Sequence, residues 1–197
     1  MLVPRPTPRT PPHPEMKHPL VSLVLLAATP AALAQSYTIT DIGSLSSNPA
    51  HAVRVSGINN RGEVHGSNEL NGAFGTPKLH SYFWDGVTQH HIYPLVPTLS
   101  LPGDLNDRSQ VVGYSFAGPT ELHGYRWEAG VLTDIHAGTL DFSHANDISR
   151  DGWVVGTNSM SVPGQMVAPF RAYLREPSGA WMDLGTLGGH RAFGFGL

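Results

Sequence analysis

Residues 57–66 read Gly57-Ile58-Asn59-Asn60-Arg61-Gly62-Glu63-Val64-His65-Gly66, and this stretch recurs twice with substitutions. Asp104–Gly113 reads DLNDRSQVVG, and Asp147–Gly156 reads DISRDGWVVG. In each copy an aliphatic anchor precedes turn-forming residues, and a valine and a glycine follow them. The anchors Ile58, Leu105 and Ile148 are spaced 47 and 43 residues apart. Self-similarity with a period of roughly 20–50 residues is the signature of repeat architectures.

Two further blocks keep the same order in each unit. The aromatic block reads His80-Ser81-Tyr82-Phe83-Trp84, then His123-Gly124-Tyr125-Arg126-Trp127, and more loosely Phe170-Arg171-Ala172-Tyr173-Leu174. The aspartate block reads Thr40-Asp41-Ile42-Gly43, Thr133-Asp134-Ile135-His136 and Met182-Asp183-Leu184-Gly185. His190–Leu197 matches His51–Ile58 in its histidine, its glycine and its final aliphatic residue. The pattern predicts units over approximately 37–93, 94–136 and 137–187, with a partial fourth unit over 188–197.

Each unit is interpreted as four short strands. In the first unit we expect strands at His51–Ile58, Glu63–Asn68, Leu79–Trp84 and Val87–Ile92, because turn sequences separate these runs. Val64, Val111 and Val154 share one strand face, and Val112 and Val155 lie on the other. An antiparallel sheet that is apolar on both faces must be covered on both sides. The predicted fold class is therefore all-β, with antiparallel four-stranded repeats in a β-propeller-like arrangement: three blades and the start of a fourth, an incomplete ring. The Tyr37–Ile42 stretch is expected to form a fourth strand that could complete the last blade of a full-length ring.

The first 34 residues predict an export signal. Residues 1–15 form a Pro-rich leader, and Met16 is an alternative start. A basic start, the apolar run Leu20–Ala28 and the Ala32-Leu33-Ala34 site follow, as in a secretory signal peptide. The apolar run is shorter than the ~20 residues of a transmembrane helix. We expect a signal peptide at 16–34, cleavage after Ala34, a β-repeat domain at 35–197, a secreted (extracellular or periplasmic) product and no membrane span in the mature chain.

Composition narrows the chemistry. The 197 residues include 12 Lys+Arg against 15 Asp+Glu, no cysteine, 22 Gly and 17 Pro. With this charge balance a nucleic-acid partner is not expected, because such binders carry a basic surface. The absence of cysteine excludes disulfides, thiolate zinc sites and a cysteine nucleophile. The many glycines and prolines favour turns over long helices.

Three stretches resemble a known family. They are Ile39-Thr40-Asp41-Ile42-Gly43-Ser44-Leu45, Gly57–Ser67 and Met182-Asp183-Leu184-Gly185-Thr186-Leu187-Gly188-Gly189. They are similar to the HAF-family extracellular repeat, whose units read roughly DLGTLGG, then GINNxGQVVG, then HAFxW. The name-giving triplet is degenerate here, as His80-Ser81-Tyr82, His123-Gly124-Tyr125 and Phe170-Arg171-Ala172. The resemblance covers residues 37–197 and implies a secreted, propeller-like bacterial repeat protein with no established activity or catalytic residues. Members usually carry more units, so a truncated chain that continues beyond Leu197 is expected.

Several histidines and acidic residues are candidate metal ligands. His80 with His90 and His91 could hold a metal ion, since imidazole is a common ligand. His80 and His123, however, occupy a repeated position whose third copy is taken to be Phe170, which favours packing. The turns at Asp104, Asn106 and 147–152 are faintly similar to calcium loops but lack the bidentate acid. No metal site and no cofactor-binding site are therefore predicted, and no cofactor is expected.

The sequence also lacks two common motifs of enzyme active sites. No G-x-S-x-G elbow and no phosphate-binding G-x-x-x-x-G-K-[ST] occurs. The carboxylates Asp104 with Asp107, and Asp147 with Asp151, lie at repeated turn positions, which favours a scaffold role. No catalytic residue is predicted.

Two functions remain open. The favoured one is a non-catalytic scaffold that binds an extracellular protein or glycan through loops that differ between units: Leu70–Lys78, Phe116–Glu121 and Ser159–Ala168. The alternative is a fragment of an extracellular propeller enzyme acting on carbohydrate, which a unit-specific polar cluster at the axis would favour. The open end blades also predict oligomerisation.

Overall fold

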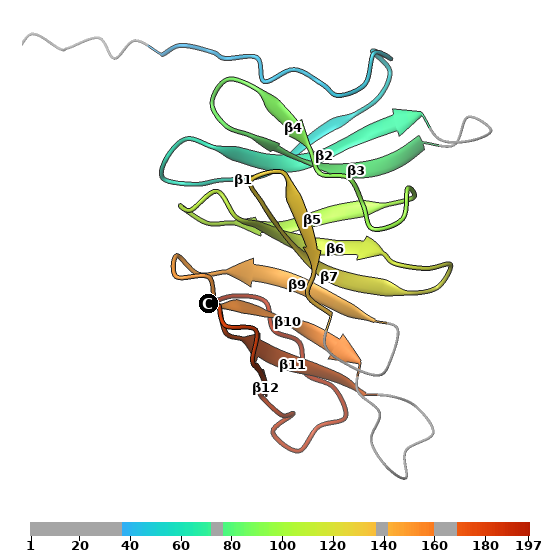
Figure 1. Cartoon of the computed structure of the whole chain (residues 1–197), viewed down its shortest axis with the longest axis vertical. Helices are drawn as coiled ribbons and strands as arrows, with labels where there is room; N and C mark the ends of the chain where they lie inside the picture. The colour runs from blue at the N-terminus through green and yellow to red at the C-terminus, as the bar shows by residue number, and fades with distance from the viewer. Residues whose placement is uncertain (1–36, 72–76, 137–141, 160–168) are drawn as a thin grey trace, which may run out of the picture. The chain divides into compact units, whose positions relative to one another are not determined.

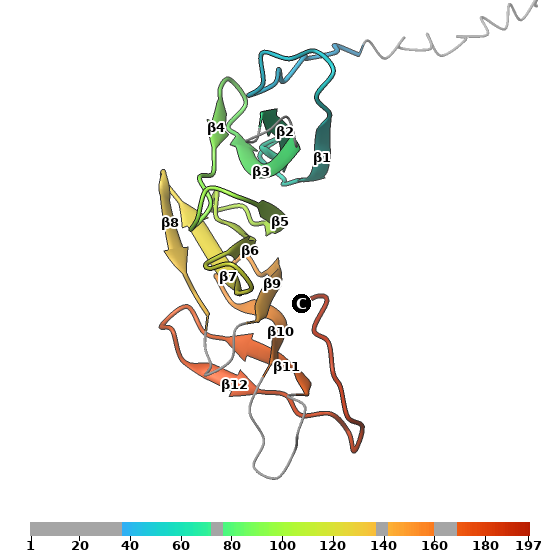
Figure 2. The same cartoon turned by 90° about the vertical axis from the view of Figure 1, so that its right-hand side faces the viewer.

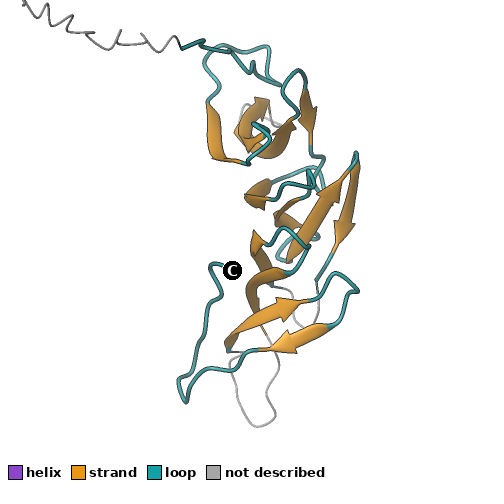
Figure 3. Ribbon diagram, turned by 90° about the vertical axis from the view of Figure 1, so that its left-hand side faces the viewer, coloured by secondary structure: helices purple, strands orange, loops and turns teal. Residues whose placement is uncertain are grey.

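The computed structural model describes residues 37–71, 77–136, 142–159 and 169–197. The chain divides into a unit at Met1–Ile39 and a unit at Thr40–Leu197, and every described strand belongs to the second. The export signal predicted at 1–34 lies outside the described residues. Among those that are described, every regular element is a β-strand (Figure 3). The search for a membrane-crossing helix found no candidate in the described part of the chain.

The strands form three antiparallel sheets of four, which follow one another in chain order (Figure 1). Sheet A contains β1 (Val53–Ile58), β2 (Val64–Asn71), β3 (Pro77–Trp84) and β4 (Gln89–His91). Sheet B contains β5 (Ser100–Leu105), β6 (Val111–Phe116), β7 (Leu122–Glu128) and β8 (Val131–Asp134). Sheet C contains β9 (Ser143–Ile148), β10 (Val154–Ser159), β11 (Phe170–Arg175) and β12 (Trp181–Asp183). The predicted all-β class with four-stranded antiparallel sheets is confirmed.

The sheets are stacked in the same orientation. Figure 2 shows β1, β5 and β9 along one side and β4, β8 and β12 along the other. Each sheet pairs its strands in sequence order, and none of the described strands joins one sheet to another in a closed ring. The first strand of each later sheet packs on the sheet before it, β5 on β2 and β3, and β9 on β6 and β7.

The turn between the first and second strands is the same in all three sheets. Its last residue takes a left-handed backbone conformation, at Gly62 (φ 79°), Ser109 (φ 61°) and Gly152 (φ 90°). In each copy that residue donates its N–H to the carbonyl three residues earlier, at 3.0–3.2 Å. A type I turn followed by one left-handed residue explains why glycine stands there twice.

The second strand needs glycine for a different reason. Gly66, Gly113 and Gly156 each lie under a tyrosine of the third strand, and a Cβ there would lie 2.6–2.8 Å from the tyrosine ring or hydroxyl. It would also lie 1.9–2.2 Å from a carbonyl oxygen of the first strand. No side chain fits in that space, so the close approach fixes glycine.

Two hydrophobic clusters fill the spaces between sheets. Phe83 and Ile92 of the sheet A unit pack against residues of sheet B that include Val111 and Trp127. Val112, on the opposite face of β6, packs against residues of sheet C that include Val154. The prediction that neighbouring valines serve opposite faces of a sheet covered on both sides is confirmed for sheet B.

Two predictions are wrong. The third copy of the aromatic block is shifted by one residue: Tyr173 lies opposite Gly156 as Tyr82 lies opposite Gly66, so Arg171, and not Phe170, is equivalent to His80. The sequence alignment is off by one residue because the ring of Phe170 resembles the imidazole ring of His80 more closely than the side chain of Arg171 does. Residues 37–42 form no strand, since they pair with no strand in the described part of the chain, although Asp41 accepts the N–H of Gly43 in the same turn that ends β8 and β12.

Candidate functional site

A ladder of amide side chains joins the first turns of the three sheets. The Asn59 side chain donates to the main-chain oxygen of Asn106 at 3.0 Å, and Asn106 donates to that of Ser149 at 3.0 Å. Within its own turn, the Asn106 side-chain oxygen accepts two backbone N–H groups, and Asn59 does the same. Asparagine therefore folds each turn and links it to the next sheet.

Charged and polar groups continue this ladder at the surface. Asn60 donates its backbone and side-chain N–H groups to Asp107 at 3.0 and 2.9 Å. Arg108 forms an ion pair with Asp151 at 3.1 Å in sheet C. The turn residues weighed as calcium ligands thus bond to the neighbouring repeat, which is a structural role.

Buried hydroxyl groups link the sheets in the interior. The hydroxyl of Ser100 accepts the N–H of Ser81 at 2.9 Å, and that of Ser143 accepts the N–H of Gly124 at 2.8 Å. Each bond connects the first strand of one sheet to the third strand of the sheet before it. Because these groups are buried, leaving them unpaired would be costly.

Asp104 and Asp147 lie beside each other in the structure, although each has a nearer acidic residue in the sequence, Asp107 and Asp151 respectively. Asp104 accepts the N–H of Ile148 at 3.2 Å, and Asp147 accepts the N–H of Leu197 at 2.6 Å. Burial, together with hydrogen bonding to Asp147, raises the pKa of Asp104 above its ordinary value. The proposed pairs with Asp107 and Asp151 do not form, because those side chains point into the surface ladder.

The three candidate metal-ligating histidines, His80, His90 and His91, belong to two separate pairs in the structure. His80 Nδ1 lies 2.8 Å from His91 Nε2, and His90 Nε2 lies 2.7 Å from Asp85. Burial, and secondarily the charge of His80, lowers the pKa of His91 to about 4. At equivalent positions His123 pairs with Asp134, and Arg171 with Asp183. No group of three metal-ligand side chains occurs among residues for which a structure is described.

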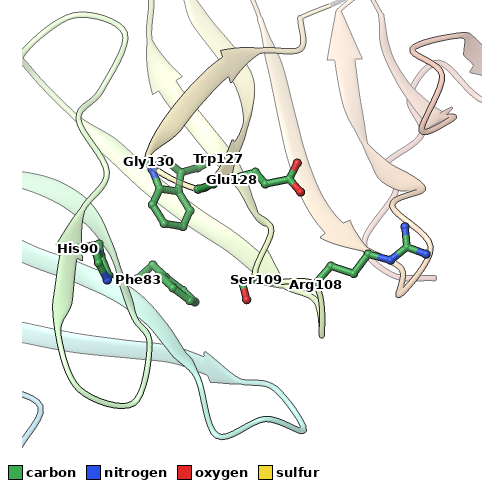
Figure 4. Close-up of a pocket in the computed structure, with 8 residues that line it drawn as sticks. Phe83, His90, Arg108, Ser109, Trp127, Glu128 and Gly130 are labelled. Carbon is green, nitrogen blue, oxygen red and sulfur yellow. The ribbon is translucent and has the colours of Figure 1, made fainter.

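A cleft of about 450 Å³ opens between sheets A and B beside the turn ladder (Figure 4). Its floor contains Phe83 and Trp127, whose ring centroids are 5.1 Å apart. The rest of the lining is polar or small: His90, Arg108, Ser109, Glu128, Ala129 and Gly130. Pockets of about 300–1,000 Å³ with an apolar floor and a few polar groups are typical ligand sites.

The aromatic floor of this cleft does not recur at the next junction. At the next junction the positions of Phe83 and Trp127 are taken by Arg126 and Arg175, as the strand registers show. The Arg175 guanidinium lies 5.7 Å from the ring centroid of Trp181. The same place in the repeat is therefore aromatic between sheets A and B and cationic between sheets B and C.

The loops predicted to bind are described only in part. Phe116–Glu121 is a turn in which Ala117 donates its N–H to the carbonyl of Glu121 at 2.9 Å. Residues 72–76 and 160–168, at the centres of the other two loops, lie outside the described residues.

Sequence reasoning did not nominate Arg108, Ser109 or Glu128 as a site. Arg108 and Ser109 looked like ordinary turn residues, and Glu128 lies in a hairpin. The signal that could have found them is the break in the repeat at Arg126 and Arg175, which shows where the neighbouring junction loses its aromatic pair.

Comparison of the chain with protein-family models, with curated proteins and with solved structures finds no match.

Proposed function

We propose that the chain is a secreted, non-catalytic β-repeat protein that acts as a binding scaffold, and that the cleft between sheets A and B holds a sugar unit of an extracellular glycan. The observation that carries this proposal is the cleft itself. It lies at a position where repeated residues hold the sheets together, yet its aromatic floor, Phe83 with Trp127, is replaced by two arginines at the next junction.

The lining suits a sugar because a pyranose ring has C–H groups on its faces and hydroxyl groups around its edge. The rings of Phe83 and Trp127, each 4% exposed, supply an apolar floor that belongs to the hydrophobic cluster between sheets A and B. The carboxylate of Glu128 and the imidazole of His90 supply acceptors and donors at the rim (Figure 4). A rigid floor lowers the ordering cost of binding.

The repeat supports the finer proposals. We propose that the three sheets are blades of a propeller-like assembly that belongs to the HAF-family repeats, because each sheet packs on the next through the same ladder and serine contacts. Secretion rests on the signal-like sequence at 16–34. An extracellular protein is the other partner that a scaffold with variable loops would suit.

A glycan array probed with the full chain tests the binding proposal. The variant Glu128→Ala removes a carboxylate from the cleft rim, and we expect it to weaken glycan binding at least tenfold. Glu176→Ala is the matched control, because Glu176 follows Arg175 in sheet C as Glu128 follows Trp127 in sheet B. Equal loss in both variants, or no glycan bound by the unmodified chain, contradicts the proposal.

One observation favours the alternative, an enzyme acting on carbohydrate. Asp104 holds its proton more tightly than usual beside Asp147, and a glycosidase needs a protonated acid next to a second carboxyl group. Against this, the two carboxyl groups lie so close that hydrogen bonding to Asp147 contributes to the raised pKa of Asp104, whereas such enzymes separate theirs by about 5 Å or more. Both also bind a backbone N–H. Release of reducing sugar that Asp104→Asn abolishes would favour the enzyme.

A further inference from the structure

The junction between sheets B and C brings two arginine side chains together. Arg126 of β7 lies opposite Val112 of β6, and Arg175 of β11 lies opposite Val154 of β10. Residues directly opposite each other in an antiparallel pair share one face of the sheet. Val112 and Val154 belong to the same hydrophobic cluster between the two sheets, so both arginines lie on the faces that meet at this junction.

Neither arginine is neutralised by a carboxylate. Each is followed closely by a glutamate, Glu128 or Glu176, yet none of the ion pairs formed by described residues includes either arginine. Asp151, in the first turn of sheet C, pairs instead with an arginine of the turn in sheet B at 3.1 Å. The carboxylate of Glu176 accepts a serine hydroxyl at 2.9 Å.

The Arg175 guanidinium has hydrogen-bond donors that are not used. Its Nε and Nη1 atoms are buried and have no hydrogen-bond partner among the described residues. Its position over the Trp181 ring fixes the guanidinium group in place. Burial, and secondarily the charge of Arg126, lowers the pKa of Arg175 below its ordinary value.

This arrangement costs free energy as it stands. Buried donors without a partner are unfavourable, and so are like charges that face each other. An anion between the two guanidinium groups would remove both costs. Arg126 and Arg175 are each only partly buried, so the edge of the junction where they lie is open to solvent.

We propose that Arg126 and Arg175 bind the carboxylate or sulfate group of an acidic sugar unit, so that the glycan held by the chain is an acidic polysaccharide. Guanidinium groups suit both anions because their N–H groups point in fixed directions toward neighbouring oxygen atoms. The anion site follows from the two arginines. Its assignment to a sugar rests on the proposed function.

The repeat places the two sites in register. Arg126 and Arg175 occupy the positions that Phe83 and Trp127 occupy one junction earlier. Stacked sheets pack roughly 10 Å apart, so the two junctions are separated by about one such spacing. A short oligosaccharide that lies along the stack would meet an aromatic floor at the first junction and two cations at the second.

Calorimetric titration of the full chain with three oligosaccharides of equal length tests the proposal. The probes are a galacturonic acid oligosaccharide, a sulfated galactose oligosaccharide and the same galactose oligosaccharide without sulfate. We expect at least one anionic probe to bind at least tenfold more tightly than the neutral probe. The tighter of the two anionic probes identifies the group as a carboxylate or a sulfate.

Two variants assign the binding to this junction. Arg126→Gln and Arg175→Gln should each weaken binding of the anionic probe at least tenfold and change binding of the neutral probe by no more than a factor of about two. Arg54→Gln is the matched control, because it removes the same charge from an exposed arginine that pairs with Glu69 at 3.4 Å. Thermal unfolding without a probe shows whether each variant is folded. If Arg175→Gln unfolds, Arg126→Gln still decides, since it leaves the contact with Trp181 in place.

Three results would overturn the anion site. They are no binding of either anionic probe at about 1 mM, equal binding of the anionic and neutral probes, and an equal loss in Arg54→Gln and Arg126→Gln. Tighter binding of a glutamate-rich peptide of the same charge would assign the arginines to a protein partner and overturn the sugar assignment. A failure of the cleft alone is distinguishable, because Glu128→Ala would then leave binding unchanged while Arg126→Gln still weakens binding of the anionic probe.

Discussion

The junction between sheets A and B has the same kinds of hydrogen bond as the junction between sheets B and C. The two junctions differ in their aromatic contacts. Both contain an amide-to-carbonyl bond from turn to turn and a serine hydroxyl that accepts a buried N–H. In the first junction the closest aromatic contact, Phe83 with Trp127, lies at the turn end. In the second, Tyr114 stacks on His144 at 3.8 Å toward the opposite end.

This difference between the junctions divides their residues into a structural group and a group that forms the cleft. Residues that recur in all or most sheets form hydrogen bonds between neighbouring repeats, and their loss should lower stability. Phe83 and Trp127, which are replaced by arginines at the second junction, form the floor of the cleft, and their loss should lower binding. One further contrast lies in the interior: His65 is buried in sheet A where sheets B and C have Val112 and Val155.

Gly113→Val should have the largest effect, because it breaks sheet B, which both junctions share. Its side chain would overlap the carbonyl of Leu101 and the hydroxyl of Tyr125. We expect the free energy of unfolding to fall by more than about 3 kcal/mol, measured by urea denaturation. Gly189→Ala is the control, since the nearest atom is 3.3 Å away, and it should change stability by less than about 0.5 kcal/mol. Similar losses in the two variants would contradict the close-approach explanation.

Acid should weaken the first junction through His65 and the second through His144, because burial lowers the pKa of each to about 4. Because the unfolded chain takes up the His65 proton first, stability is complete above about pH 6.5 and is lost as pH falls toward 4, by about 3 kcal/mol. We expect His65→Val to remove this part of the pH dependence, measured by urea denaturation at pH 7 and pH 4.5.

Asp104 changes the free energy of unfolding in the opposite direction to His65. Its raised pKa favours the folded state at low pH, and this contribution is lost as pH rises through the pKa of the folded state. The comparison of His65→Val with the unmodified chain cancels that contribution. An unchanged pH dependence in the variant would show that His65 is not buried in its neutral form.

Asn106→Ala should cost about 2 kcal/mol, because its buried side chain makes four hydrogen bonds and links sheets B and C. Ser149→Ala should cost no more than about 1 kcal/mol, because the Ser149 hydroxyl accepts only the N–H of Trp153. Thermal unfolding of the two variants measures the difference. A Ser149 variant as destabilised as the Asn106 variant would mean that the amide-to-carbonyl bond contributes nothing.

The smallest effect should be a gain. Ala129 has φ 49° in the two-residue turn between β7 and β8, a conformation that asparagine adopts more easily. Ala129→Asn should stabilise the protein by roughly 0.5–1 kcal/mol and raise the melting temperature. Ala180→Asn, in the corresponding hairpin of sheet C, has no such backbone strain to relieve and is the control. A melting temperature that falls in the Ala129 variant would contradict this reading of the turn.

The sequence predicts the strands well because valine, tyrosine and glycine recur for reasons local to one repeat. Strand 2 shows this: the expected Glu63–Asn68 is observed as Val64–Asn71. It predicts the site poorly, because the cleft arises where Phe83 and Trp127 from different sheets meet, and a within-repeat alignment does not contain that contact. The shift at Phe170 has the same origin, since only pairing with β10 fixes the register of β11.

The most direct test of the account is one titration, in which the glycan that binds best is added to the folded Glu128→Ala and Asn106→Ala variants. We expect a dissociation constant at least ten times higher for Glu128→Ala and within a factor of about two for Asn106→Ala, since Glu128 lines the cleft and Asn106 holds the sheets together. The reverse order would contradict the division between residues that hold the repeats and residues that bind.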